Sequence, residues 1–329
     1  MAAESFTGPP AAEAGITSEH AGHRTPGPGE VRLRVTAALV TGLERAAARG
    51  AGDFRGVPGH AFVGVVEAAG PAVDPALTGR RVVPSPLAWC GGCPRCRGGL
   101  REHCLRRTVL GLEGRDGGLA SHAVVSAASM VEVPESMDDE VAVFAAPLGS
   151  ALAVRRQVPA VGRGFVTVLG DGTLGLLAVQ VLAPANPGVR LIGRSSEKLG
   201  LCERWGIKHR HVDDIGRRAD QEVVLECTGR DEGLELACRL VRPRGTVVLK
   251  SILPPSERMA PGTRTDPLTL GEHHLVGSFL GPVDEAMRML AAGVVDVLPL
   301  IEQRVRLSAV RRLLAADRPP GSRAVLVRP

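Results

Sequence analysis

The sequence predicts an α/β protein with a β-rich first half and, in the second half, a parallel sheet flanked by helices. Up to about residue 150, short apolar segments are separated by turns rich in Gly and Pro. Beyond that point, short apolar strands alternate with amphipathic helices, which is the pattern of βαβ units. A glycine-rich turn at 170–175 joins the first of these strands to its helix. With 329 residues, the chain is long enough for two domains.

Three segments of the first half have the composition of β-strands. Apolar and polar residues alternate over Val31–Val35, and Phe62–Glu67 and Arg81–Val83 are short apolar runs. Turns are predicted at Pro26–Gly29 and Asp116–Gly118, where Gly and Pro cluster. These features are typical of a small β-barrel.

The second half alternates strands with helices from residue 165 onward. Short apolar strands are expected at Phe165–Leu169, Val189–Ile192, Val223–Leu225 and Thr246–Leu249. Amphipathic helices are expected between them, at Thr173–Leu182, Glu197–Trp205 and Glu232–Leu240. After about residue 275 the pattern becomes mixed, with further strands at Leu275–Ser278 and Ala324–Val327.

Composition and charge exclude several classes of function. The net charge is +5, but only three of the 40 basic residues are lysines, and the arginines are scattered along the chain. There is no tyrosine and aromatics make up 2%, so the stacking surface of a nucleic-acid binder is missing. No apolar run approaches the ~20 residues of a membrane helix. The N-terminal residues lack the basic and apolar regions of a signal peptide, so a cytoplasmic location is expected.

The glycine-rich turn matches the dinucleotide-binding pattern G-x-G-x-x-G. Gly170 would make the tight turn, Gly172 would let the backbone approach a pyrophosphate, and Gly175 would let helix and strand pack closely. Thr173 and Leu174 begin the helix, whose exposed N–H groups would bind phosphate oxygens. The alternative is a strand–turn–helix connection in which the glycines only allow a tight turn and no nucleotide binds.

The end of the second strand indicates which nucleotide binds. An NAD site usually has Asp or Glu about 20 residues past the glycine loop, to bind the ribose 2′-hydroxyl. Here Gly193 occupies that position, followed by Arg194, Ser195 and, in the next helix, Lys198. These groups suit a 2′-phosphate, so the sequence favours NADP over NAD. The alternative is a surface arginine beside an ordinary serine N-cap.

Four of the seven cysteines lie within fifteen residues. The spacing of Cys90, Cys93, Cys96 and Cys104 predicts a structural zinc site with four thiolate ligands. A redox Cys-x-x-Cys pair would leave two cysteines unexplained, and an iron–sulfur cluster is the other alternative. Nearby arginines are expected to offset the thiolate charge, namely Arg95, Arg97 and Arg101. The remaining three are interpreted as small buried hydrophobic residues, namely Cys202, Cys227 and Cys238.

Taken together, these segments resemble the zinc-containing alcohol dehydrogenase branch of the medium-chain dehydrogenase/reductase family. Pro28–Val31 is similar to its early PGEV segment, Pro58–Gly64 to its GHE segment, and Phe144–Leu148 to a stretch with a further metal-ligand position. The resemblance implies a GroES-like β-barrel domain and a Rossmann domain with a doubly wound parallel sheet. The expected divisions are a catalytic domain, a nucleotide-binding domain and a C-terminal return, at 1–149, 150–275 and 276–329.

The departures from the family all fall on its catalytic zinc site. In the segment Ala38–Glu44, Leu39 takes the place of the ligand cysteine and Gly42 that of the acid after it. Alanines replace two glutamates, at Ala61 and Ala146, and only His60 remains. One imidazole cannot hold zinc where three protein ligands are required, so the catalytic zinc is predicted to be absent. His122 is the one substitute ligand that the sequence offers.

Two functions fit this combination. The first is a zinc-independent NAD(P)H oxidoreductase acting on a carbonyl, quinone or activated alkene, with Thr41 binding the oxyanion and His60 supplying a proton. An apolar pocket for the substrate would then form from Leu39, Ala61 and Ala146. The second is a non-catalytic nucleotide-binding homologue, a sensor or partner subunit, in which His60 is structural. The resemblance also implies a dimer or tetramer, with 274–278 as the edge strand that pairs with its copy.

Overall fold

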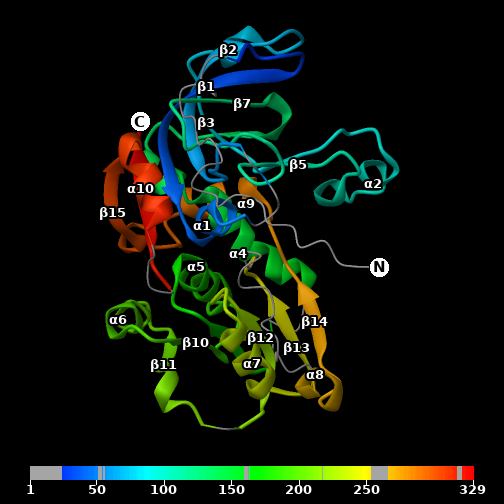
Figure 1. Ribbon diagram of the computed structural model, residues 1–329, viewed down its shortest axis with the longest axis vertical. Helices are drawn as coiled ribbons and strands as arrows, with labels where there is room; N and C mark the ends of the chain where they lie inside the picture. The colour runs from blue at the N-terminus through cyan, green and yellow to red at the C-terminus, as the bar shows by residue number, and fades with distance from the viewer. Residues whose placement is uncertain are drawn as a thin grey trace, which may run out of the picture.

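A computed structural model describes residues 24–50, 54, 56–158, 162, 164–216, 218–252, 266–316 and 321–329 (Figure 1). Two large sheets organise the molecule, one mostly antiparallel and one entirely parallel. The predicted α/β class, with a barrel-like sheet and a doubly wound parallel sheet, is therefore confirmed. None of the described helices is both long and apolar enough to cross a membrane.

The first sheet contains seven strands. Its order is β15 (Ile301–Arg306), β16 (Ala324–Arg328), β1 (Glu30–Val40), β2 (Phe62–Ala69), β3 (Arg81–Pro84) and β8 (Met130–Glu132), with β7 (His122–Ser126) also paired to β1. Along β1, Val31, Leu33 and Val35 are buried, while the residues between them reach solvent to varying degrees. The alternation ends at Ala37, and the last four residues of the strand are all buried. The C-terminal end of β1 thus runs into the interior, where the cleft lies.

The cysteine-rich segment forms a separate projection beside this sheet (Figure 1). It joins a small sheet of β4 (Leu87–Ala88), β5 (Thr108–Leu110) and β6 (Gly114–Arg115). A short helix, α2 (Pro94–Arg97), and a 3₁₀ turn at Arg101–His103 lie within the loop. The other short helices of this half are α1 (Gly42–Ala48) and α3 (Asp139–Ala142).

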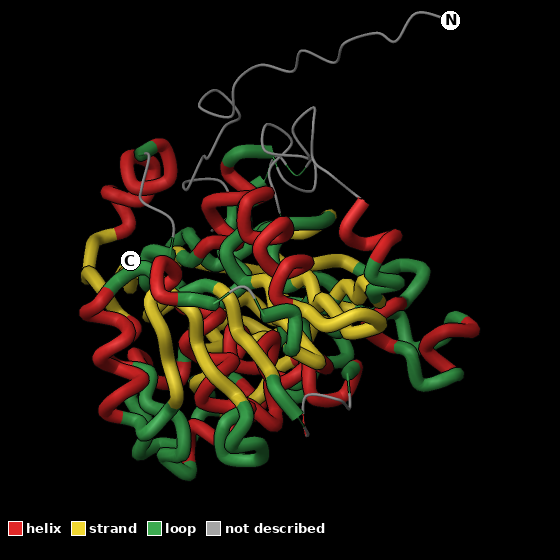
Figure 2. Tube along the Cα trace, turned by 90° about the horizontal axis from the view of Figure 1, so that it is seen from below, coloured by secondary structure: helices red, strands yellow, loops and turns green. Residues whose placement is uncertain are grey.

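The second sheet has six parallel strands with helices on either side (Figure 2). Its order is β11 (Lys208–His211), β10 (Val189–Gly193), β9 (Val166–Leu169), β12 (Gln221–Glu226), β13 (Val241–Leu249) and β14 (His274–Gly277). This 3-2-1-4-5-6 order is that of the Rossmann fold, which places ligands at the carboxyl ends of the strands. The helices are α5 (Thr173–Leu182), α6 (Ser196–Arg204), α7 (Asp231–Leu240) and α8 (Asp266–Leu270).

Among the described helices of nine or more residues, two have no counterpart in the sequence predictions, and none of the shorter helices was predicted either. α4 (Ala145–Gln157) contacts both α5 and α9 (Val283–Ala291). Residues 145–154 of α4 are all buried, so these ten residues have no solvent-facing side and no amphipathic period to detect. The chain then returns through β15, α10 (Val310–Ala315) and β16, which pairs antiparallel with the inner end of β1.

Candidate active site

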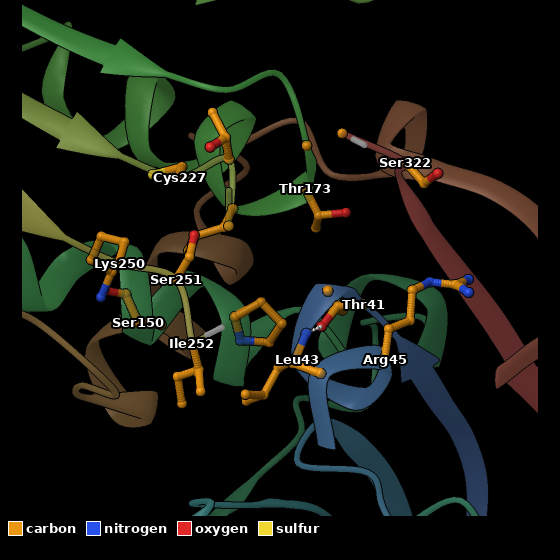
Figure 3. A pocket seen from close by; sticks show the side chains of 18 of the residues that line it. Thr41, Leu43, Arg45, Ser150, Thr173, Cys227, Lys250, Ser251, Ile252 and Ser322 are labelled. Atoms are coloured by element: carbon orange, nitrogen blue, oxygen red, sulfur yellow. Dashed lines mark hydrogen bonds between the residues drawn. The ribbon is translucent and has the colours of Figure 1, made fainter. Parts of the chain in front are cut away.

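A cleft of about 220 Å³ lies between the barrel sheet and the carboxyl ends of the parallel strands. Thr41, Leu43 and Arg45 line it from the barrel side, as Figure 3 shows. The opposite wall comes from the parallel-sheet half and includes Gly172, Thr173, Ser150, Cys227, Lys250, Ser251 and Ile252. This position, at the carboxyl edge where the strand order reverses, is where doubly wound sheets bind ligands.

The glycine loop has the geometry of a phosphate-binding turn. Gly170 adopts φ +114°, which a residue with a side chain rarely takes. A Cβ on Gly175 would lie 1.9 Å from the carbonyl oxygen of Gly170, so only glycine lets α5 approach β9 this closely. Gly172 is the N-cap of α5 and lines the cleft. Beside it, the buried Thr173 Oγ1 has no hydrogen-bond partner among the described residues. An unpartnered hydroxyl at a helix N-terminus fits a phosphate ligand.

A second, smaller pocket of about 70 Å³ continues from the cleft toward β10, and both cavities are lined by Cys227, Thr228, Arg230 and Gly321. Gly193 and Arg194, which the sequence assigns to the nucleotide, line this second pocket. Asp171, the second residue of the glycine loop, lines it too and is 5% exposed. Sequence reasoning treated Asp171 as a variable position of the pattern.

His60, Glu44 and Thr41 form a buried hydrogen-bonded group at the barrel side of the cleft. The His60 Nδ1 and the Glu44 carboxylate are in hydrogen-bond contact, and the His60 backbone N–H donates to Glu44 Oε1 at 3.0 Å. The other carboxylate oxygen, Oε2, accepts from the Thr41 hydroxyl at 2.7 Å and from the Thr41 backbone N–H at 2.9 Å. Glu44 is 1% exposed, and it is the centre of the group.

Glu44 remains ionised despite its burial. Burial alone would raise the pKa of this carboxyl, but the adjacent His60 and the hydrogen bonds from His60 and Thr41 outweigh it and hold the pKa at about 2. The sequence analysis named Glu44 only as the last residue of the segment Ala38–Glu44 and gave it no role. The available signal was Thr41 three residues before Glu44, the spacing of the capping box that the structure contains.

Thr41 has a structural task that limits its predicted role. Its hydroxyl donates to Glu44 and accepts from the Leu43 backbone N–H at 3.2 Å, which makes it the N-cap of α1. Donation to a substrate oxyanion would require the hydroxyl to leave Glu44. His60 differs, since Nδ1 is engaged by Glu44 but Nε2 has no hydrogen-bond partner among the described residues, and His60 lines the cleft.

The apolar substrate pocket predicted from Leu39, Ala61 and Ala146 is not there. All three side chains are at most 1% exposed, belong to the main hydrophobic core and do not line the cleft. The space vacated by the lost polar residues is filled by packing. His122 is no substitute ligand either, because its Nε2 pairs with Glu67 at 3.2 Å on the barrel sheet and it does not line the cleft.

The four clustered cysteines come together as their spacing predicts. Their ligand atoms all lie within 4.8 Å of one another, with Sγ–Sγ distances of 3.5 Å for Cys90–Cys104 and 3.9 Å for Cys93–Cys104. Tetrahedral zinc with Zn–S bonds of about 2.3 Å requires sulfurs roughly 3.8 Å apart, so the donor set fits this metal. Within the described residues this is the only group of three or more His, Cys, Asp or Glu able to hold a metal ion.

The charge around the cysteines differs in detail from the prediction. A hydrogen bond from Arg106, a residue not named by the sequence analysis, lowers the pKa of Cys90 to about 6. Arg95 instead donates to the His103 carbonyl, and Arg101 lies over the Trp89 ring. Of the three isolated cysteines, Cys202 and Cys238 are buried as predicted, whereas Cys227 is half-buried and lines the cleft.

Lys250 is a second cleft residue that sequence reasoning did not single out. Its ammonium donates to the carbonyls of Ser150 and Phe279 at 2.8 and 2.6 Å and to the Ser278 hydroxyl at 3.1 Å. Burial lowers its pKa to about 8. Its three bonds tie α4 to the segment after β14, so Lys250 positions one wall of the cleft. The sequence feature that could have identified Lys250 is its position directly after a buried parallel strand, at the edge of the sheet where ligands bind.

The parallel sheet has the strand order of Rossmann folds, and comparisons with known proteins show what the chain is similar to. Residues 27–135 match the model of the alcohol dehydrogenase GroES-like domain. The chain is 37% identical over 161 residues to the starvation-sensing protein RspB of Escherichia coli K12, spanning 48% of this chain and about half (47%) of that relative.

Solved structures extend the similarity to nearly the whole chain. One from Sinorhizobium meliloti 1021, described as a zinc-binding dehydrogenase bound to NADP, has a TM-score of 0.79 at 28% identity, covering 93% of this chain and 94% of its own. Another, from E. coli CFT073 and named a short chain alcohol dehydrogenase in complex with NADH, has a TM-score of 0.78 at 26% identity, covering 93% of each chain. Residues 27–135 thus match an alcohol dehydrogenase GroES-like domain, and the chain as a whole is similar in fold to zinc-binding and alcohol dehydrogenases of known structure.

Proposed function

We propose that this protein is a nicotinamide-nucleotide-dependent oxidoreductase that interconverts a small carbonyl compound and its reduced form without a catalytic zinc. The observation that carries the proposal is the cleft itself. It brings His60, supported by an ionised buried glutamate, to the same cavity as the glycine loop and the unpartnered Thr173 hydroxyl. The quinone and activated-alkene substrates that the sequence allows remain within this proposal.

The pyrophosphate of the nucleotide would be held by the glycine loop, the N-terminus of α5 and Thr173. The bound nucleotide would supply the hydride. His60 would exchange a proton with the substrate oxygen through Nε2, the ring nitrogen that has no hydrogen-bond partner in the described part of the chain. The Glu44 carboxylate fixes the orientation of the imidazole ring, and the low pKa of Glu44 keeps the carboxylate charged. Glu44 and Thr41 are thus positioning residues, and His60 is the proposed catalytic residue.

The absence of a catalytic zinc is part of the proposal. Leu39, Ala61 and Ala146 offer no metal-binding atoms and are packed into the core, and His60 is engaged by Glu44. We further propose that the four clustered cysteines hold one structural zinc, which contributes folding energy rather than chemistry. The exposed edge strand β14 supports the proposed homo-oligomer, because it pairs with one neighbouring strand within the described part of the chain.

The variant His60→Asn tests the catalytic assignment. Asn can still donate to Glu44 from a position near Nδ1, but it has no counterpart of Nε2. With NADH or NADPH and a panel of aldehydes, ketones, quinones and enones, we expect kcat to fall about 100-fold while nucleotide affinity is unchanged. His122→Asn, a histidine outside the cleft, is the matched control. Equal kcat for His60→Asn and wild type would exclude His60 as the proton carrier.

A second function is favoured by a specific observation. The core fills the predicted substrate pocket, and the Thr41 hydroxyl is engaged as a helix cap. These features suit a non-catalytic nucleotide-binding homologue, a sensor or partner subunit. Nucleotide binding without turnover across the whole substrate panel would support this function over the reductase.

A further inference from the structure

The nucleotide-binding half has an unusual arrangement where β10 ends. Nicotinamide-nucleotide domains commonly place a carboxylate there, about 20 residues after the glycine loop, to bind the adenosine ribose. This chain has Gly193, and the sequence alone therefore favours NADP. The structure shows that the region still contains a buried carboxylate, which comes from Asp171 in the glycine loop.

Asp171 occupies the space that a side chain at position 193 would need. A Cβ built on Gly193 would lie 2.7 Å from Asp171 Cβ and 2.8 Å from its Oδ2. Glycine at 193 is therefore a requirement of aspartate at 171, since the two positions cannot both carry side chains without displacement. The carboxylate in this region therefore comes from the loop that precedes α5 and not from the end of β10.

Three donors beside the end of β10, two backbone N–H groups and the Lys198 ammonium, are already bonded. Asp171 Oδ2 accepts from the backbone N–H groups of Arg194 and Ser195, each at 2.8 Å. Lys198 Nζ donates to the Gly321 carbonyl at 2.6 Å and lies 3.7 Å from Asp171 Oδ1. A phosphate placed here would lose these donors and lie beside a buried negative charge, which low polarity makes costly.

One oxygen of Asp171 remains available to a ligand. Oδ1 accepts no hydrogen bond within the described residues, and Asp171 lines the second pocket together with Gly193 and Arg194. A ribose hydroxyl can donate to such an oxygen, whereas a phosphate monoester offers mainly acceptors. The geometry thus distinguishes the two nucleotides by the chemistry of one substituent.

We propose that Asp171 is the specificity-determining residue of the nucleotide site, accepting a hydrogen bond from the adenosine ribose 2′-hydroxyl and selecting NADH over NADPH. The inference rests on the nucleotide binding of the proposed function. It reverses the preference for NADP that Gly193 alone suggested, because Asp171 places a carboxylate beside Gly193 from a different segment of the chain.

The first test uses the wild-type protein and three nucleotides. Fluorescence titration should give an affinity for NADH at least tenfold higher than for NADPH. The 2′-deoxyadenosine analogue of NADH should bind about tenfold more weakly than NADH, since a hydrogen bond to a charged acceptor is lost. Equal or tighter binding of NADPH, or no effect of the missing hydroxyl, would overturn the assignment. Failure of all three nucleotides to bind would instead overturn the nucleotide binding of the proposed function.

The second test moves the acid. Asp171→Asn keeps the shape and removes the charge, so the ratio of NADH to NADPH affinity should fall at least tenfold. The double variant Asp171→Gly, Gly193→Asp returns the carboxylate to the end of β10 and should restore NADH preference. Glu197→Gln, an exposed acid on the same helix as Lys198, should leave the ratio unchanged. A ratio unaffected by Asp171→Asn would refute the proposal, and the deoxy-nucleotide result decides it if the variants do not fold.

Discussion

The family resemblance implies metal ligands both in the cysteine loop and at the inner end of β1. The loop has retained its metal-binding side chains, whereas the end of β1 has not. In the loop, four thiols converge at distances suited to zinc. At the end of β1, Leu39, Ala61 and Ala146 lie in the main hydrophobic core, and His60 is bonded to Glu44. One region keeps every donor, and the other has replaced donors with packing.

The difference has an energetic reason. The loop is a projection whose buried residues are three cysteines, packed only against Trp89 and Cys90. Such a small apolar cluster cannot by itself offset the chain entropy of ordering the loop, so the loop depends on a cross-link. The end of β1 lies in a core of dozens of buried side chains, where apolar replacements are stabilised by burial. Metal binding is thus retained where it supplies the folding energy.

Metal content gives the largest expected effect. Purified protein should contain one zinc per chain, and Cys104→Ser should remove nearly all of it, because three thiolates leave the tetrahedral site open. Residues 90–104 should then become sensitive to limited proteolysis. Elemental analysis measures the metal, and Cys238→Ser, a buried thiol elsewhere, is the control. Two zinc ions per chain would contradict the comparison, since the second would indicate a metal centre in the cleft.

Restoring a family-like carboxylate in the core should have the next largest effect. Ala146→Glu places an acid at a position 1% exposed within α4, and we expect a loss of about 4 kcal/mol in unfolding free energy. Urea unfolding measures the loss, and Ala185→Glu, at an exposed turn position, should change it by less than about 0.5 kcal/mol. Wild-type stability with a newly bound zinc would show that the region still accepts a polar site.

Glu44→Gln should have a smaller effect that depends on pH. At pH 7 the free energy of unfolding of the variant should be about 3 kcal/mol lower than that of the wild type, because the ionised group in a buried pair is removed. The pKa of Glu44 is about 2 in the folded protein against 4.5 ordinarily, so its ionised form stabilises the fold fully above pH 4.5. That stabilisation is lost as pH falls from 4.5 toward 2.

Unfolding curves for wild type and Glu44→Gln should therefore converge below pH 4.5. Glu113→Gln is the control, because this glutamate is half-exposed and its pair with Arg107 is worth little. A difference between wild type and Glu44→Gln that stays constant down to pH 2.5 would mean that Glu44 is not the ionised partner of His60.

The sequence by itself determined whatever depends on residues close together along the chain. The strands and helices that were predicted for the parallel sheet appear within a residue or two of their expected bounds, except that β13 begins five residues earlier. The edge strand β11 and the short helix α8 were not predicted. The cysteine spacing brought the thiols together, and the glycine pattern gave a turn in which Gly170 and Gly175 have the predicted local roles. Local spacing suffices in these cases because backbone geometry links sequence distance directly to position in space.

Only the tertiary structure decided what fills each space. α4 was missed because residues 145–154 are buried on all sides and therefore show no amphipathic period. Glu44 reaches His60 across sixteen residues, and Asp171 reaches the N–H groups of Arg194 and Ser195 across more than twenty. Whether a position vacated by a lost side chain becomes a pocket, a packed core or the site of another carboxylate depends on which distant segments lie beside it. Leu39 and Gly193 show two of these outcomes. Leu39 is packed into the hydrophobic core, whereas the space beside Gly193 is occupied by the carboxylate of Asp171.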